Sequence, residues 1–379
     1  MLYKNTMRRN DRTSKTLGFC RCLMLYVCTA TLIVQAPSSP LERMSVETVC
    51  GMRLRPTSSD NIRMTPMGTR SFPGDTAVFI FQNNFWVNLH HFLRGEARRR
   101  SLNLPLELPL SKLSVNERAA WEAALDAYID LAKRSLLFDA MLVRIDNILA
   151  RVTDTTALKS NKIDPKIVAA LDSAAPIYRA HLWDQHRRAN DYWIATYGPA
   201  IRQHAVAVKK AIADAFQAIP PNGPILVDLA RDTGPTLAYT TEGPAGTAGH
   251  TVLAPQKNSD PEVALDTIFH EISHTMDNQI TQLIDGEAKR QGIKIPPDLW
   301  HAMTLYTTSE IVKREMGKQG DPTYRPDAAR VEMFKKSGWE EILFDMEKFW
   351  RPYLEGKTSL QSALHDLIQS VAHESSNPT

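Results

Sequence analysis

The chain has 379 residues, of which 43% are hydrophobic and 23% charged, as is typical of a globular protein that can bury a core of its own. The formal net charge is only +3, and no block of like charges is long enough to form a nucleic-acid-binding arm. We therefore expect no nucleic-acid partner.

The first 36 residues have the layout of a secretory signal peptide. A basic stretch at 1–15 precedes an apolar run from Cys22 to Val34, and the small residue Ala36 follows. The apolar run is too short to make a comfortable membrane span. We expect an exported protein, periplasmic or extracellular, with no stable membrane span after processing; an uncleaved anchor is the alternative. The mature chain would keep one thiol, Cys50, and so no internal disulfide.

The remaining residues divide by pattern into three regions. Residues 37–75 are rich in Pro, Ser, Thr, Met and Arg without periodicity, which is typical of a linker or an extended lead-in. Residues 76–220 begin with a strand-like segment and then form an N-terminal helical region. Residues 221–379 are expected to form the catalytic region.

Local signals place the elements within these regions. Ser114 and Glu117 have the spacing of a capping box and predict that a helix begins there. Pro199 is expected to kink or break a long helical stretch. Apolar segments typical of strands lie at 225–230, 235–241 and 250–255. This order predicts a predominantly helical α+β fold with a small mixed sheet.

The stretch FHEISHTMDN, residues 269–278, carries the chemistry. On a helix, His270, His274 and Asp277 fall within about 60° of one another. The four-residue spacing stacks two imidazoles one turn apart, where both can offer a nitrogen to one ion at about 2.0 Å. Glu271 lies about 100° round from His270 and can take a proton from a metal-bound water without being a ligand. The pattern predicts a metal site, and a solvated polar helix face is the alternative.

The segment HEISH resembles the active-site helix of the zincin metallopeptidases. The glycine and third histidine of the metzincin branch are missing after it, so we expect the helix to run on, as in the gluzincin (thermolysin-like) branch. The resemblance covers residues 225–316 or so. It implies a zincin-like catalytic core, a catalytic Zn²⁺, a water activated by Glu271, and peptide-bond hydrolysis.

The third metal ligand departs from the gluzincin pattern, in which it is a glutamate on a later helix. His301, followed by the small residue Ala302, occupies that place, whereas Glu310 has the family's chemistry but lies half a turn round the same helix. We favour His301, with Glu310 as the first alternative and Asp277 or Glu287 as further ones. A three-histidine site still binds zinc, but its extra positive charge should acidify the water and weaken its attack.

Two residues near the motif are candidates for supporting roles. Asp277 is expected to hold a ligand imidazole in its tautomer, or else to be solvated. Tyr306 is expected to donate a hydrogen bond to a developing oxyanion, with core packing as the alternative.

The substrate side is expected around the strand at 250–255. This strand precedes the motif helix, as the substrate-pairing edge strand does in zincins, so a peptide is expected to add to it, with His250 near the cleft. The adjacent His90 and His91 point to different faces of a helix, so that one of the two side chains could face the substrate cleft.

The residues thus favour an exported zinc metallopeptidase acting on a peptide or protein substrate. A zinc hydrolase of the same architecture on a non-protein substrate is one alternative, and a non-catalytic zinc-binding protein is another. Glu271 argues against a non-catalytic zinc-binding protein, because such a protein needs no general base at that position.

Overall fold

The structure is a computed structural model of the chain, and it describes residues 77–154, 157–318, 333–335 and 337–375. The signal peptide expected at 1–36 and the lead-in expected at 37–75 lie outside the described residues.

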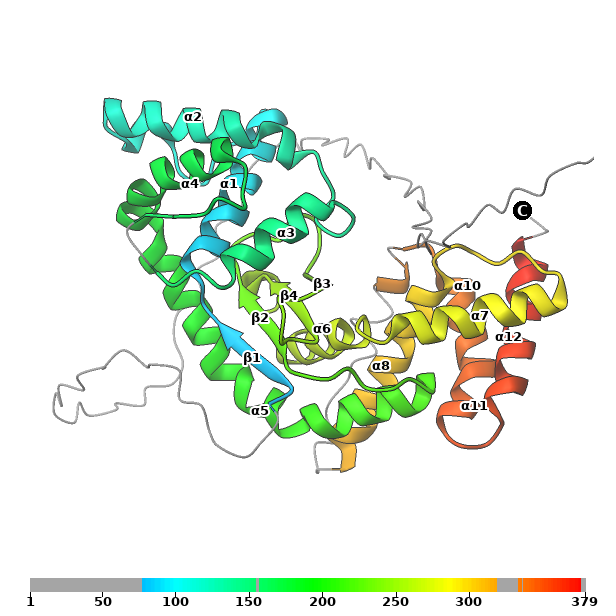
Figure 1. The fold of residues 1–379 in the computed structure, drawn as a ribbon. Helices are drawn as coiled ribbons and strands as arrows, with labels where there is room; N and C mark the ends of the chain where they lie inside the picture. Colours follow the sequence, from blue (N-terminus) through cyan, green and yellow to red (C-terminus); the bar gives the residue numbers. More distant parts are fainter. Residues whose placement is uncertain (1–76, 155–156, 319–332, 336, 376–379) are drawn as a thin grey trace, which may run out of the picture. The chain divides into compact units, whose positions relative to one another are not determined.

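Helices make up most of the described chain (Figure 1). The α-helices are α1 Phe85–Ser101, α2 Val115–Ala132, α3 Ala140–Leu149, α4 Pro165–Tyr178, α5 Asp184–Phe216, α6 Pro261–Ser273, α7 Asp277–Gln291, α8 Leu299–Lys318, α10 Glu340–Asp345, α11 Arg351–Leu354 and α12 Leu360–Ser375. Short 3₁₀ turns lie at Leu110–Lys112 and Pro255–Lys257, and π-helical turns at Arg179–Trp183 and Met346–Trp350.

The capping box expected at the start of α2 is confirmed. The backbone N–H of Glu117 donates to Ser114 Oγ at 3.4 Å, and the backbone N–H of Ser114 donates to Glu117 Oε2 at 2.9 Å. The break expected at Pro199 is absent, because α5 continues through that residue. Figure 1 shows α5 bent along its length, in keeping with a helix that contains a proline.

A four-stranded mixed sheet lies at the centre, in the order β1-β2-β4-β3. Its strands are β1 Phe79–Gln82, β2 Ile225–Leu229, β3 Ala238–Thr241 and β4 Gly249–Leu253. β1, β2 and β4 are parallel to one another, whereas β3 runs antiparallel to β4. The expected α+β class with a small mixed sheet is therefore confirmed.

The edge strand near the motif helix is not the one that we expected from the sequence. We expected the strand at 250–255 to be the edge, but β4 is bonded on both sides, to β2 and to β3. β3 is the edge strand instead, because the chain passes through a seven-residue turn region at 242–248 and returns inside β3. The order of strands along the sequence does not fix their order in a sheet. In this hairpin the later strand, β4, lies on the inner side of β3.

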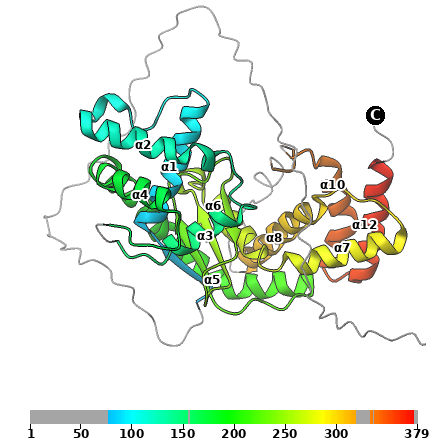
Figure 2. The same ribbon diagram turned by 45° about the horizontal axis from the view of Figure 1, so that its top comes forward.

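Helices lie on both sides of the sheet (Figure 2), and each face contributes to its own apolar core. One core joins Val227, Leu229 and Leu253 to helices α5 to α8 and to the C-terminal helices. The other joins Leu226 and Val252 to helices α1 to α4. Because side chains alternate along a strand, neighbouring residues of β2, β3 and β4 belong to opposite cores.

The region boundary expected near residue 220 marks a change of pattern within one compact unit, Pro73–Thr379. β1 comes from the N-terminal side of that boundary and pairs with β2 from the other side. Among the described residues, no helix combines the length and the apolar character that a membrane crossing requires.

The capping box gives a stability prediction. Replacing Ser114 by alanine removes the side-chain acceptor at the start of α2 and should lower the free energy of unfolding by about 1 kcal/mol, measured by urea denaturation. The matched control is Ser101→Ala, because the Ser101 hydroxyl donates only to the Arg98 carbonyl at the exposed end of α1. Equal effects of the two substitutions would contradict the assignment.

Candidate metal centre

Helix α6 carries the HEISH motif into the space beside the sheet. It begins at the N-cap Asp260, whose carboxylate accepts from the Glu262 backbone N–H at 2.8 Å, and Pro261 occupies the first helical position. Ile268, Phe269 and Ile272 are completely buried in the core that α6 shares with α5 and α8. Packing on that side fixes which way the motif's polar residues face.

The helix ends at the motif, contrary to the expectation that it runs on. His274 is the C-cap residue of α6, and α7 begins at Asp277. The hydroxyls of Ser273 and Thr275 donate to the carbonyls of His270 and Ile272, the residues three positions earlier. Such bonds engage carbonyls near the helix end and compete with helix continuation. In this respect the chain departs from the gluzincin pattern.

Three imidazoles meet at the end of α6. Nε2 of His270 lies 3.1 Å from Nε2 of His274 and 3.1 Å from Nε2 of His301, which stands in the first turn of α8. One ring nitrogen from each histidine lies within 4.8 Å of the others. Nitrogens at 2.0–2.1 Å from a tetrahedral ion would be about 3.3 Å apart, so the two separations of 3.1 Å are close to those of ligands that share one divalent cation. The expected trio His270, His274 and His301 is brought together.

The environment favours the neutral, metal-binding form of two of these rings. Burial, reinforced by His274 and His301, holds the pKa of His270 well below its usual value. Burial, reinforced by His274, lowers the pKa of His301 to about 3. For His274, burial also disfavours the charged form, but Asp277 and Glu271 outweigh it and the pKa is raised. Among the three rings, a proton is therefore accommodated best at His274.

Asp277 supports His274 as expected. Its Oδ2 lies 3.4 Å from His274 Nδ1, and it is the first residue of α7, where a carboxylate also interacts favourably with the helix dipole. The contact leaves His274 Nε2 directed at the other two rings, which is the arrangement of a carboxylate orienting a metal-binding histidine. Nδ1 of His270 has no such partner within the described part of the chain.

Glu271 is buried, with 5% of its surface exposed, and it faces the sheet. Its Oε2 accepts a hydrogen bond of 2.7 Å from the hydroxyl of Thr240 on β3, and that hydroxyl also lies 2.7 Å from the Thr251 hydroxyl on β4. Burial raises the pKa of Glu271, while His274 and the Thr240 hydrogen bond oppose the increase. The carboxylate is thus tied to the edge strand.

The alternative third ligands lie outside the histidine cluster. Glu310 is paired with Arg351 at 3.8 Å, and Glu287 lies 3.1 Å from Nδ1 of His365 on α12. Neither carboxylate belongs to the group of residues whose donor atoms converge. Of the choices that the sequence left open, His301 is the one that the geometry supports.

The catalytic role expected for Tyr306 is not supported. Tyr306 on α8 is completely buried in the apolar core, and its hydroxyl oxygen is inaccessible to solvent. Five residues separate it from His301, so on a helix its side chain points about 140° away from the metal-binding face. Core packing, the alternative interpretation, describes it.

His90, His91 and His250 do not face the histidine cluster, which corrects their expected place near the cleft. All three are at most 2% exposed. His250 Nε2 lies 2.8 Å from Asp228 Oδ2, and His91 contacts Tyr239 on the same side of the sheet. Alternation along the strands puts these side chains on the face opposite Thr240 and Glu271.

Two tryptophans enclose His301 and were not predicted from the sequence. The ring of Trp300 stacks on His301 with centroids 5.2 Å apart, and Trp339 meets His301 edge-on at 5.5 Å. The indole N–H of Trp339 donates to Asp298 Oδ2 at 2.6 Å, and the Asp298 carbonyl accepts from the His301 backbone N–H at 2.9 Å. The adjacent Trp and His in DLWHA were visible, but the contact with Trp339 depends on the tertiary fold.

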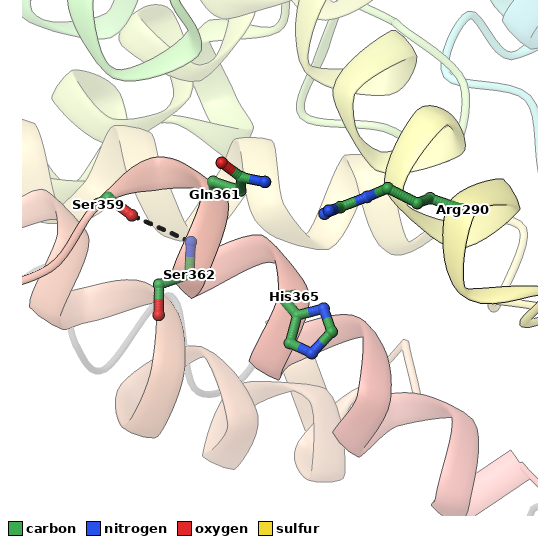
Figure 3. Close-up of a pocket in the computed structure, with 5 residues that line it drawn as sticks. All are labelled: Arg290, Ser359, Gln361, Ser362 and His365. Atoms are coloured by element: carbon green, nitrogen blue, oxygen red, sulfur yellow. Dashed lines mark hydrogen bonds between the residues drawn. The ribbon is translucent and has the colours of Figure 1, made fainter.

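A separate hollow lies between α7 and α12 (Figure 3). Arg290, Ser359, Gln361, Ser362 and His365 line it, and the Ser362 backbone N–H donates to Ser359 Oγ at 3.1 Å. The carboxylate of Glu287 already pairs with Arg290 and His365. The hollow contains none of the converging histidines.

Comparison with protein-family models, curated proteins and solved structures found no match to this chain.

The choice of third ligand makes a direct prediction. His301→Ala should weaken zinc binding by well over ~100-fold, because loss of a ligand costs more than the ~10- to 100-fold typical of an outer partner. Glu310→Ala is the matched control from the same helix and should retain the ion. Zinc affinity is measured by competition with a chelator, and loss of zinc in the Glu310 variant alone would contradict the assignment.

Asp277 gives a second, smaller effect. Asp277→Asn keeps the size of the side chain but removes the charge opposite His274 Nδ1, so zinc affinity should fall by roughly 10- to 100-fold with the fold intact. The same competition titration measures it. An unchanged affinity would show that Asp277 does not support the site.

Proposed function

We propose that this chain is a zinc-dependent metallopeptidase, exported through its N-terminal signal peptide. The observation that carries the proposal is the convergence of three imidazole nitrogens beside a buried carboxylate, Glu271, next to the edge of the sheet. When bound by the three imidazoles, zinc supplies Lewis-acid chemistry that lowers the pKa of a coordinated water.

Glu271 is the general base in this proposal. It takes the proton from the attacking water and can return it to the leaving amine. Burial raises the pKa of Glu271 toward the range in which a carboxylate exchanges protons efficiently near neutral pH. The Thr240 hydroxyl holds Oε2 at 2.7 Å and so limits the rotation of the carboxylate.

The edge strand β3 favours a peptide as the substrate. Within the described residues β3 pairs only with β4, so its other side offers backbone N–H and C=O groups to an extended chain. Thr240 lies on this strand and contacts the base, so a peptide added alongside would run past Glu271. A non-protein substrate would gain little from such an edge.

A non-catalytic zinc-binding role fits less well. A carboxylate with 5% exposure is costly to bury, and three histidines need no acidic group beside them to bind zinc. A role in proton transfer would account for the buried carboxylate of Glu271.

Replacement of the base tests the proposal. Glu271→Gln keeps the size and the Thr240 contact but cannot accept a proton, so peptide cleavage should fall by about 10²- to 10⁴-fold with zinc stoichiometry still near one. Cleavage is measured by mass spectrometry on a broad library of peptides. Glu262→Gln, from the first turn of the same helix, is the matched control. Undiminished cleavage by the Glu271 variant would rule out the mechanism.

A further inference from the structure

A buried carboxylate stands on the face of the sheet opposite the histidine cluster. Asp146 of α3 is 1% exposed, and its Oδ2 accepts a hydrogen bond of 3.0 Å from the Tyr239 hydroxyl. His91 Nε2 lies 3.0 Å from that hydroxyl and 3.2 Å from Asp146 Oδ1. Burial would raise the pKa of Asp146, but His91 and His90 outweigh it and hold the pKa well below its usual range. A carboxylate is a stronger hydrogen-bond acceptor than a neutral group, and this one is held by both the tyrosine and the histidine.

Helix α3 and the residues directly after it contact the β3–β4 hairpin at two further points. The Asn147 amide donates to the Glu242 carbonyl at 2.8 Å, directly after β3. The Arg151 guanidinium donates to the Ala245 carbonyl at 2.6 Å, within the turn that leads to β4. Together with Asp146, these residues tie α3 and the turn that follows it to the β3–β4 hairpin.

Thr240, the residue after Tyr239 on β3, points to the other side of the sheet. Tyr239 packs in the core of α1 to α4, whereas Thr240 points to α6 and donates to Glu271. β3 has only four residues and, in the part of the chain that the structure describes, a single neighbouring strand, so its backbone is held by one ladder there. Edge strands of this kind open locally more easily than central ones.

We infer that Asp146 and Tyr239 are positioning residues that anchor the edge strand β3 from the far side of the sheet and so fix the Thr240 hydroxyl against Glu271. The consequence for catalysis rests on the proposed function, whereas the anchoring of β3 does not. Because the anchor and the base lie on opposite faces, neither Asp146 nor Tyr239 touches the substrate or the ion.

Hydrogen exchange tests the anchoring without any assay of activity. In the full-length chain, Tyr239→Phe keeps the ring but removes the hydroxyl, so amides of β3 should exchange about 10- to 100-fold faster than in the wild type. Amides of β2 should change little. The control is Tyr178→Phe, which removes another buried tyrosine hydroxyl, 2.7 Å from His186 Nδ1. It should leave β3 unchanged.

Two results would overturn the anchoring. One is unchanged exchange in β3 of the Tyr239 variant, and the other is an equal increase in β2 and β3, which would mean that the hydroxyl serves global stability alone. Should Tyr239→Phe fail to fold, Asp146→Asn retains an acceptor for the tyrosine without the charge. It should then speed exchange in β3 selectively, by a smaller factor.

Peptide hydrolysis gives a separate readout of the link to the base. Thr240→Val and Tyr239→Phe should each lower kcat about five- to tenfold with KM nearly unchanged, and Thr240→Ser should recover most of the loss. A Thr240→Val variant with the wild-type kcat would overturn the link. Absence of hydrolysis by the wild type would instead contradict the proposed function, and the exchange result would then decide the anchoring by itself.

Discussion

The histidine cluster depends on the close approach of three basic nitrogens in a place largely removed from water. At 3.1 Å, two protonated imidazoles would repel each other strongly, and burial adds to the cost of each charge. The pKa values of His270 and His301 are lowered accordingly. Neutral imidazoles whose nitrogens converge in this way can offer their lone pairs to a common cation.

The small sheet connects this cluster to the rest of the chain. Its two faces serve different purposes: one packs against α6, which carries the histidines and Glu271, and the other packs against α1 to α4, where Asp146 lies. β3 joins the two through adjacent residues, Tyr239 and Thr240. A polar network in one core can therefore influence the position of a carboxylate in the other.

Much of the fold and part of the site could be predicted from local signals. The capping box at Ser114, the three short strands after residue 224 and the four-residue spacing of His270 and His274 each depend on neighbours in the sequence, and the structure contains all of them. His301 could be chosen only through a resemblance to a family pattern, since its contact with His270 spans 31 residues.

The remaining features depend on tertiary contacts that no local pattern contains. The sequence could not show that β4 pairs on both sides or that Tyr306 turns into the core. The contact of Asp146 with Tyr239 joins residues 93 positions apart. Each of these features concerns which side of an element faces which neighbour.

The most direct test of the central claim is X-ray absorption spectroscopy of the purified protein, combined with metal analysis. The account predicts one zinc ion per chain, with three imidazole nitrogens at about 2.0 Å and an oxygen completing the shell. A protein that binds no zinc at stoichiometric level after incubation with the ion, or that binds it through fewer than three imidazoles, would contradict it.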